Sequence, residues 1–134
     1  MIRLTKAGEY GIRALRYLVE NQDNGRVSIA DISVAKNIPE PFLRKLFKPL
    51  VEAGIVTSTR GVSGGVSLAK EPEEISVLAV IEALEGPLAL NECLLDDASC
   101  EFMTECGMHD VWEETQAAMV KVLEKRDLTH LLKE

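Results

Sequence analysis

The chain has 134 residues, of which 46% are hydrophobic, and its formal net charge is -7. This length suits one compact folding unit with an appended arm and excludes two independent cores. No apolar run approaches the roughly 18 residues of a membrane span, and the start, MIRLTKAGEYGIRAL, lacks the form of a signal peptide. We therefore expect a cytoplasmic protein with no membrane partner.

The charge is divided unevenly along the chain. Residues 1–70 hold 11 Lys/Arg and 6 Asp/Glu, a balance of +5, whereas residues 71–134 hold 4 and 16, a balance of -12, and together these give -7. A basic N-terminal part can neutralise phosphates while an acidic C-terminal part stays off DNA. Accidental segregation over a solvated surface explains the charge about equally well, so charge alone leaves nucleic-acid binding open.

Hydrophobic periodicity predicts helices in the first part of the chain. A helix begins after Thr5, which suits an N-cap. Past a turn at QDNGR, Ser28 with Asp31 three residues later marks the start of a short helix that Asn37 closes. A second helix, over residues 39–54, follows almost at once. Two short helices joined by a tight turn are typical of a helix-turn-helix.

The next segment, IVTSTRGVSGGVSLAK, holds two β-branched runs joined by a glycine-rich turn and predicts a hairpin. A helix-turn-helix followed by a hairpin is a winged helix. Ser76 then caps a further helix that ends at Gly86. A long last helix has one apolar face, made of Met108, Val111, Trp112, Thr115, Ala118, Met119 and Val122. Such a face needs a partner surface, which favours dimerisation.

Candidate DNA-contacting residues follow from this arrangement. The second helix of a helix-turn-helix lies in the major groove, where its first turns reach base edges and phosphates. Here those turns offer Glu40, Arg44, Lys45 and Lys48. In the hairpin, Arg60 can enter a narrow minor groove, and Gly64 and Gly65 let the backbone approach a surface closely. The alternative is an ordinary amphipathic helix with a solvated basic face, and the hairpin favours DNA binding.

All three cysteines lie in one polar stretch, CLLDDASCEFMTECGMH. They are Cys93, Cys100 and Cys106, and His109 follows the last of them in a C-x2-H arrangement. Three cysteines cannot pair completely, and a reducing cytosol disfavours disulfides, so a metal site or redox chemistry is the better interpretation. Three thiolates and an imidazole suit either an iron–sulfur cluster or tetrahedral zinc. Spacing alone does not separate these two, and exposed free thiols are the remaining alternative.

The opening LTKAGEYGIRAL, the turn RGVSGG and the three cysteines ahead of a long helix resemble the Rrf-type family of bacterial winged-helix transcriptional regulators, which includes IscR, NsrR and CymR. The resemblance covers nearly the whole chain. It implies a homodimer, crossed through the long helix, that binds a partly palindromic operator in double-stranded DNA. It also implies that Arg60 is the arginine that enters the minor groove.

The same resemblance favours an iron–sulfur cluster over zinc, because cluster-binding members carry three cysteines here and CGMHDVW is similar to a stretch of IscR, the family's regulator of iron–sulfur biogenesis. The implied ligands are Cys93, Cys100, Cys106 and His109, with a 2Fe–2S cluster favoured over 4Fe–4S. Glu9 in the first helix is the competing fourth ligand, since some members complete the cluster with a carboxylate from the partner subunit.

We therefore expect a mainly α fold with a small β-hairpin wing: a winged helix-turn-helix plus a long C-terminal dimerisation helix. The expected domains are a DNA-binding domain at 1–87, a cysteine-rich cluster-binding loop at 88–107, and the dimerisation helix with the C-terminal tail at 108–134. The expected function is a cluster-dependent repressor that senses redox state, nitric oxide or cluster status. No nucleophile–base pair or phosphate loop indicates an enzyme. The alternative function is a zinc-stabilised or cluster-free protein-interaction module, or a thiol-based regulator.

Overall fold

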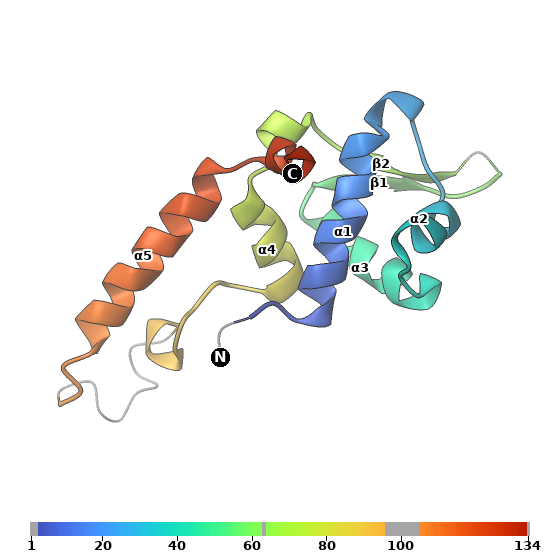
Figure 1. The fold of residues 1–134 in the computed structure, drawn as a ribbon. Coiled ribbons are helices and arrows are strands. Elements are labelled where there is room, and N and C mark those ends of the chain that lie inside the picture. Colours follow the sequence, from blue (N-terminus) through green and yellow to red (C-terminus); the bar gives the residue numbers. More distant parts are fainter. Residues whose placement is uncertain (1–2, 63, 96–104, 134) are drawn as a thin grey trace.

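The computed structural model describes residues 3–62, 64–95 and 105–133. Its α-helices are α1 (Lys6–Glu20), α2 (Ile29–Lys36), α3 (Glu40–Glu52), α4 (Val77–Glu85) and α5 (His109–Lys125). Strands β1 (Val56–Thr59) and β2 (Gly65–Leu68) form an antiparallel hairpin. Short 3-10 helices lie at η1 (Gln22–Asn24), η2 (Pro72–Glu74), η3 (Glu92–Leu94) and η5 (Leu128–Leu132). Helices α1 to α4 and the hairpin form a body, and α5 lies along its flank (Figure 1). This mainly helical arrangement with a hairpin wing is the winged helix that the sequence predicts.

Local sequence signals set the helix starts where they were predicted. Thr5, Ser28 and Ser76 each accept a hydrogen bond from the backbone N–H three residues later, at 3.4, 3.0 and 3.0 Å. These bonds satisfy donors that the first turn of a helix leaves without a partner. Asn37 ends α2 in the left-handed conformation, with φ 52°, which Asn tolerates better than most residues. A tight turn of three residues then leads into α3, and the two helices form the helix-turn-helix.

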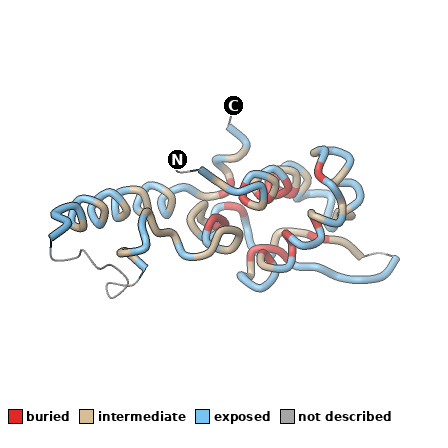
Figure 2. Tube along the Cα trace, turned by 90° about the horizontal axis from the view of Figure 1, so that it is seen from below, coloured by how far each residue is buried: buried red, intermediate tan, exposed pale blue. Residues whose placement is uncertain are grey.

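One hydrophobic core holds the body together. It is built from fully buried side chains of several elements, among them Leu15 of α1, Ile32 of α2, Leu43 and Leu50 of α3, Val66 of β2 and Val80 of α4. Burial of each such side chain stabilises the fold by about 1.5–3 kcal/mol. The buried positions lie in the body and are lacking from α5 (Figure 2). The core therefore fixes α3 and the hairpin relative to each other.

Two glycines allow α1 to pack closely against α4. A Cβ atom on Gly11 would lie 2.3 Å from Leu84 Cδ1, and one on Gly8 would lie 2.2 Å from Glu85 Oε1. Since such distances are well inside van der Waals contact, a larger residue at either position would require the Leu84 or Glu85 side chain to move. At this contact the Glu85 carboxylate accepts hydrogen bonds from Thr5 N at 2.9 Å and Thr5 Oγ1 at 2.8 Å.

The chain returns to the body after α5, which the sequence analysis did not foresee. Leu128 in η5 is 1% exposed and belongs to the same core as α1. Backbone hydrogen bonds secure this return: Leu128 N donates to Ile75 O at 3.0 Å, and Val77 N donates to Arg126 O at 2.8 Å. The C-terminal segment thus completes the core of the N-terminal body.

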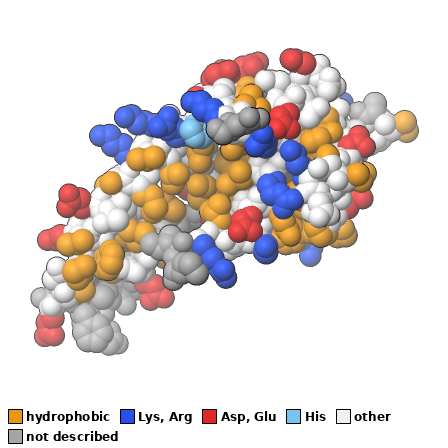
Figure 3. All heavy atoms as spheres, viewed as in Figure 1, with side chains coloured by type: hydrophobic (Ala, Val, Ile, Leu, Met, Phe, Trp, Pro, Cys, Tyr) orange, Lys and Arg blue, Asp and Glu red, His pale blue; other side chains and the backbone are white. Residues whose placement is uncertain are grey.

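Helix α5 has no buried residue, and its apolar face is divided between two environments. Trp112 and Met119 are half-buried, and Met119 lines a hollow of about 550 Å³ together with Leu4 and Ile81 of the body. Hydrophobic side chains gather along α5 in the space-filling view (Figure 3). Met108, Val111 and Val122 are 40%, 46% and 57% exposed. None of the described helices has the length and apolar content that crossing a membrane requires.

Candidate nucleic-acid interface and cysteine region

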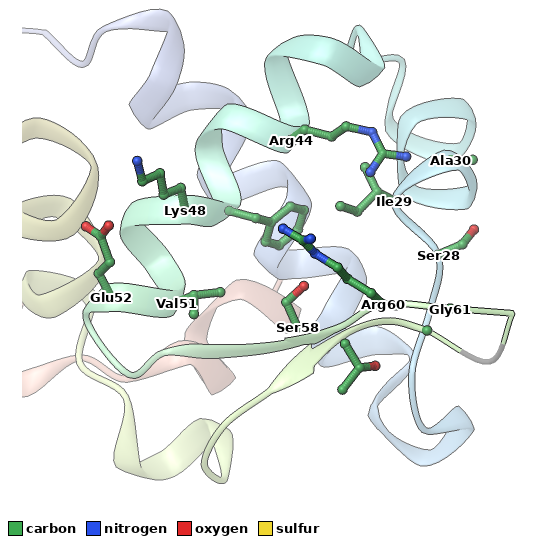
Figure 4. Close-up of a pocket in the computed structure, with 14 residues that line it drawn as sticks. Ser28, Ile29, Ala30, Arg44, Lys48, Val51, Glu52, Ser58, Arg60 and Gly61 are labelled. Atoms are coloured by element: carbon green, nitrogen blue, oxygen red, sulfur yellow. The ribbon is translucent and has the colours of Figure 1, made fainter.

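A groove of about 730 Å³ runs between α3, the start of α2 and the hairpin (Figure 4). Of the predicted DNA-contacting residues, those that line it are Arg44, Lys48, Arg60, Gly64 and Gly65. Lys45 is exposed on α3 but does not line the groove. The fold therefore brings the helix and hairpin residues, which are separate in sequence, to one concave surface.

Basic side chains enter this groove from both walls. Arg60 extends from the end of β1 toward α3, and Arg44 extends from α3 toward the start of α2 (Figure 4). The Arg44 guanidinium donates to the Glu40 carboxylate at 2.6 Å. Within the described residues, neither Lys48 nor Arg60 has an ion pair within 4.0 Å. Their charges are available to phosphate or base acceptors, for which ammonium and guanidinium groups are suited.

The wing glycines are required by the hairpin itself. A Cβ on Gly64 would lie 2.5 Å from Thr59 O, and one on Gly65 would lie 2.5 Å from Val27 O. Gly65 also has φ 154°, which other residues rarely adopt. Val27 and Val66 exchange backbone hydrogen bonds at this point. The glycines thus shape the wall that carries Arg60, a constraint that the sequence alone did not reveal.

Side chains of α1 hold the helix-turn-helix in place. The Tyr10 ring meets the Phe42 ring edge-on, with centroids 5.5 Å apart. Arg13 lies over Tyr10 at 5.2 Å and donates to the Lys36 carbonyl at the end of α2. An aromatic pair and a cation over a ring each add about 0.5–1.5 kcal/mol. Sequence reasoning missed these positioning residues because helix α1 and the turn are distant along the chain.

The described cysteine-region residues lie at the start of α5 and near η3. Cys93 is half-buried within η3, and Cys106 is exposed two residues before the N-cap of α5. His109 is the first residue of α5, and its Nδ1 atom is buried with no hydrogen-bond partner. Cys100 lies outside the described residues. Glu9, on α1, is half-exposed and pairs with Lys6 at 3.3 Å.

Hydrogen bonds connect this region to α5. Leu90 N donates to Gln116 Oε1 at 3.0 Å. The Asn91 amide, oriented with its oxygen toward the indole, accepts from Trp112 Nε1 at 3.1 Å. These contacts fix the segment before Cys93 against the first half of α5.

Within the described residues, no three His, Cys, Asp or Glu side chains gather closely enough to hold a metal ion. The donor chemistry nevertheless fits an iron–sulfur cluster. Thiols from Cys93 and Cys106 and the imidazole of His109 are the donors that such clusters take. A buried polar atom without a partner is costly, by about 1–3 kcal/mol, so the unpartnered His109 nitrogen suits a ligand.

Comparison with known proteins places these features in a family. The sequence matches Rrf2, described as iron-dependent transcriptional regulator, over residues 4–134. The chain belongs to the Rrf2 family. Rrf2-family proteins regulate transcription, and this chain is accordingly a DNA-binding transcriptional regulator and not an enzyme.

Three relatives show how far the similarity to Rrf2 proteins extends. Protein rrf2 of Nitratidesulfovibrio vulgaris is 35% identical over 133 residues, which cover 99% of this chain and 89% of the relative. The structure of CymR, the global cysteine regulator of Bacillus subtilis, has a TM-score of 0.80 at 31% identity and covers 98% of this chain and 96% of CymR. The structure of IscR from T. potens has a TM-score of 0.76 at 31% identity and covers 98% of this chain and 87% of IscR.

Proposed function

We propose that this Rrf2-family regulator is a homodimeric repressor whose affinity for its operator depends on an iron–sulfur cluster. Operator contacts come from Arg44, Lys45 and Lys48 of α3 and from Arg60, Gly64 and Gly65 of the hairpin. The cluster ligands are Cys93, Cys100, Cys106 and a fourth residue, His109 in preference to Glu9, with 2Fe–2S favoured. Redox state, nitric oxide or cluster supply is the signal.

The observation that carries the proposal is the groove between α3 and the hairpin. Its two walls bear Arg44 and Lys48 on one side and Arg60 on the other. A recognition helix reads the major groove, and an arginine on a projecting turn suits the minor groove. The core fixes the two walls together, so both contacts form without rearrangement of the chain.

An exposed stripe on α5 supports the homodimer. Met108, Val111, Thr115, Ala118 and Val122 are exposed and stand alternately three and four residues apart. This spacing is the a/d pattern by which two helices pack side by side. A second copy of α5 would cover the stripe and set the distance between two recognition helices.

The position of the cysteine region supports the sensing role. When bound, an iron–sulfur cluster supplies a group that is sensitive to electrons and nitric oxide, with a potential set by ligands and solvent exposure. Cys93 lies in η3, two residues after Asn91, which bonds to α5. His109 begins the same helix. A change in ligation therefore acts directly on the helix that carries the dimer stripe, and so on the operator-binding geometry.

A second candidate is a thiol-based regulator without a cluster. The similarity to CymR, a global cysteine regulator, extends over nearly the whole of both chains. Moreover, Cys93 and Cys106 are free cysteines. Within the described residues, they belong to no group of three metal donors. A zinc-stabilised interaction module remains the other alternative, because Cys3His also suits tetrahedral zinc.

One set of measurements on anaerobically purified protein separates these candidates. The proposed regulator should be coloured and should contain iron and acid-labile sulfide. A colourless protein with one zinc per chain would support the interaction module, and one with neither metal would support the thiol-based regulator. Either of these results would contradict the proposed iron–sulfur cluster.

The DNA part is tested on a duplex recovered by selection from a randomised library. Arg60→Ala should weaken binding to that duplex by about 1–3 kcal/mol, because one direct contact is lost. Arg126→Ala, which removes the same charge from an exposed site outside the groove, serves as the control. If both variants bind as the parent does, the wing is not part of the interface.

Neighbouring alanines on α5 test the dimer. Ala118 belongs to the exposed stripe, whereas Ala117 is exposed beside it. Ala118→Asp should yield monomers in sedimentation, since it places two carboxylates at the interface. Ala117→Asp should leave the dimer intact. If Ala118→Asp still sediments as a dimer, the interface lies elsewhere.

A further inference from the structure

We propose that Glu40 determines the DNA specificity of this regulator by positioning Arg44 for base edges and disfavouring its contact with phosphates. The inference rests on the proposed function of the α3–hairpin groove. It assigns a role to a carboxylate that contacts a basic residue of the groove.

Glu40 and Arg44 form a pair on the exposed ridge of the recognition helix. The Glu40 Oε1 atom lies 2.6 Å from Arg44 Nη2, and the side chains are 39% and 61% exposed. Charged residues recur at four-residue steps along this ridge, as Glu40, Arg44, Lys48 and Glu52. Within the described residues, the first two form an ion pair, whereas Lys48 and Glu52 form none within 4.0 Å.

The pair limits what Arg44 can do. An unpaired arginine at this position would bind any phosphate, since that contact carries no sequence information. The Glu40 carboxylate beside it repels phosphate oxygens and partly cancels the charge that attracts them. Phosphate contact therefore becomes the less favourable use of the Arg44 side chain.

Base recognition is favoured by the same geometry. Guanidinium has five N–H donors in a fixed fork, and Glu40 occupies the Nη2 end of that fork. The other donors remain available to guanine O6 and N7, while a carboxylate can accept from cytosine N4. Glu40 and Arg44 together offer an acceptor and donors, which suit the edge of a G·C base pair in the major groove.

Glu52 provides a matched control. Glu52 lines the groove at the C-terminal end of α3, whereas Glu40 reaches the groove only through its contact with Arg44. Glu52 carries the same charge but has no arginine partner among the described residues. Glu52→Gln therefore reports the effect of removing one negative charge from this surface. Any additional effect of Glu40→Gln reports the pairing with Arg44.

The experiment uses the full-length protein, purified anaerobically, and duplexes selected from a randomised library. For each variant, affinity is measured for the parent's selected duplex and for mixed-sequence genomic DNA at one salt concentration. Glu40→Gln should raise affinity for mixed-sequence DNA about three- to tenfold and reduce the ratio of selected to mixed-sequence affinity about tenfold. Glu52→Gln should leave that ratio within about twofold, as expected for a sequence-independent charge effect. Glu40→Gln should also select duplexes in which a G·C preference is lost.

A combined variant identifies the route of the effect. In an Arg44→Ala background, Glu40→Gln should change the affinity ratio no further, because the positioned group is gone. A change that persists there would overturn positioning through Arg44. Equal ratios for Glu40→Gln and Glu52→Gln would also overturn the inference. If the parent protein selects no duplex at all, the operator-binding proposal itself fails, and these outcomes are thereby distinguished.

Discussion

The winged-helix body and the segment from η3 through α5 are built in opposite ways. In the body, α1, α3 and α4 all direct apolar side chains into one core, with Leu15 and Leu43 fully buried. Helix α5, although longer than any of these, buries no residue. The body is therefore stabilised by its own packing and presents a fixed surface. The α5 segment leaves apolar side chains and thiols accessible, and these need a second chain or a ligand.

Helix α5 packs against α4 of the body and also contacts η3. Gln116 bonds to the backbone of Leu90, and Met119 faces the hollow beside Leu4. Beyond α5, Leu128 inserts into the core of the body. Because α5 is held at its middle and beyond its C-terminal end, a change near its start would reach the body through these contacts. DNA recognition needs a fixed surface, whereas sensing needs groups that a ligand or a second chain can reach. The two regions of this chain meet these two requirements separately.

The largest expected difference between the two regions follows from replacing the cysteine ligands of the proposed cluster. Cys93→Ala, Cys100→Ala or Cys106→Ala should each abolish bound iron, because thiolates hold iron–sulfur clusters. The winged-helix body should keep its melting temperature within a few degrees, since Cys93 and Cys106 lie outside its core. Iron analysis and thermal denaturation under anaerobic conditions measure both. His130→Ala, at an exposed histidine, is the control that should retain iron.

Absorption spectra of variants purified in the same way compare the two candidates for the fourth ligand. His109→Ala should alter the absorption spectrum more than Glu9→Ala, because the His109 nitrogen is buried without a partner, whereas Glu9 pairs with Lys6. The reverse order would transfer the ligand to Glu9. Iron loss in the His130→Ala control would show that the assay reports general damage.

The next largest effect is a loss of stability, which shows whether the C-terminal segment belongs to the core of the body. Leu128→Ala should lower the free energy of unfolding by about 2–5 kcal/mol, as is typical for a buried leucine. Leu132 lies in the same short helix but is 44% exposed, so Leu132→Ala should cost about 0.5 kcal/mol or less. Urea denaturation compares the two. Equal destabilisation would mean that η5 does not complete the core.

A smaller effect is expected at the connection between the regions. Gln116→Ala leaves the Leu90 N–H without its acceptor and should destabilise the protein by about 1 kcal/mol. Hydrogen exchange at Leu90 should become faster, while Glu114→Ala, at an exposed neighbour on α5, should leave it unchanged. Unaltered exchange in Gln116→Ala would remove this bond from the coupling route.

The smallest effect concerns an ion pair on the body. The hydrogen bond from Arg16, aided by the Lys36 charge, holds the pKa of Glu20 below its ordinary value of 4.5. A depressed carboxyl pKa contributes stability above pH 4.5 that is lost as pH falls through the folded-state pKa. The side chain is 33% exposed, and solvent screening limits the contribution to about 0.3–0.5 kcal/mol.

Glu20→Gln should therefore flatten the acid limb of the stability curve slightly, measured by urea denaturation at neutral and acidic pH. Glu82→Gln, at an exposed carboxylate of α4, should leave that limb as it is. An equal change in both variants would assign the effect to overall charge and not to the pair.

Local signals explain why much of the body could be predicted from sequence. Thr5, Ser28 and Ser76 cap helices through bonds to residues only three positions away. The hairpin follows from two short β-branched runs around a glycine-rich turn, and its register pairs Val56 with Leu68. The basic residues of the groove were also predicted, because the sequence predicts both the helix and the hairpin turn that carry them.

Other features depend on contacts between distant residues. The sequence by itself determined the helix ends, the hairpin, the charge asymmetry and the gathering of thiols, since each arises from neighbours within a few residues. Only the tertiary structure decided that Leu128 completes the core, that Gly65 must clear the backbone of Val27, and that α5 divides its apolar face. The physical reason is that packing depends on the path of the whole chain, which periodicity along one segment does not encode.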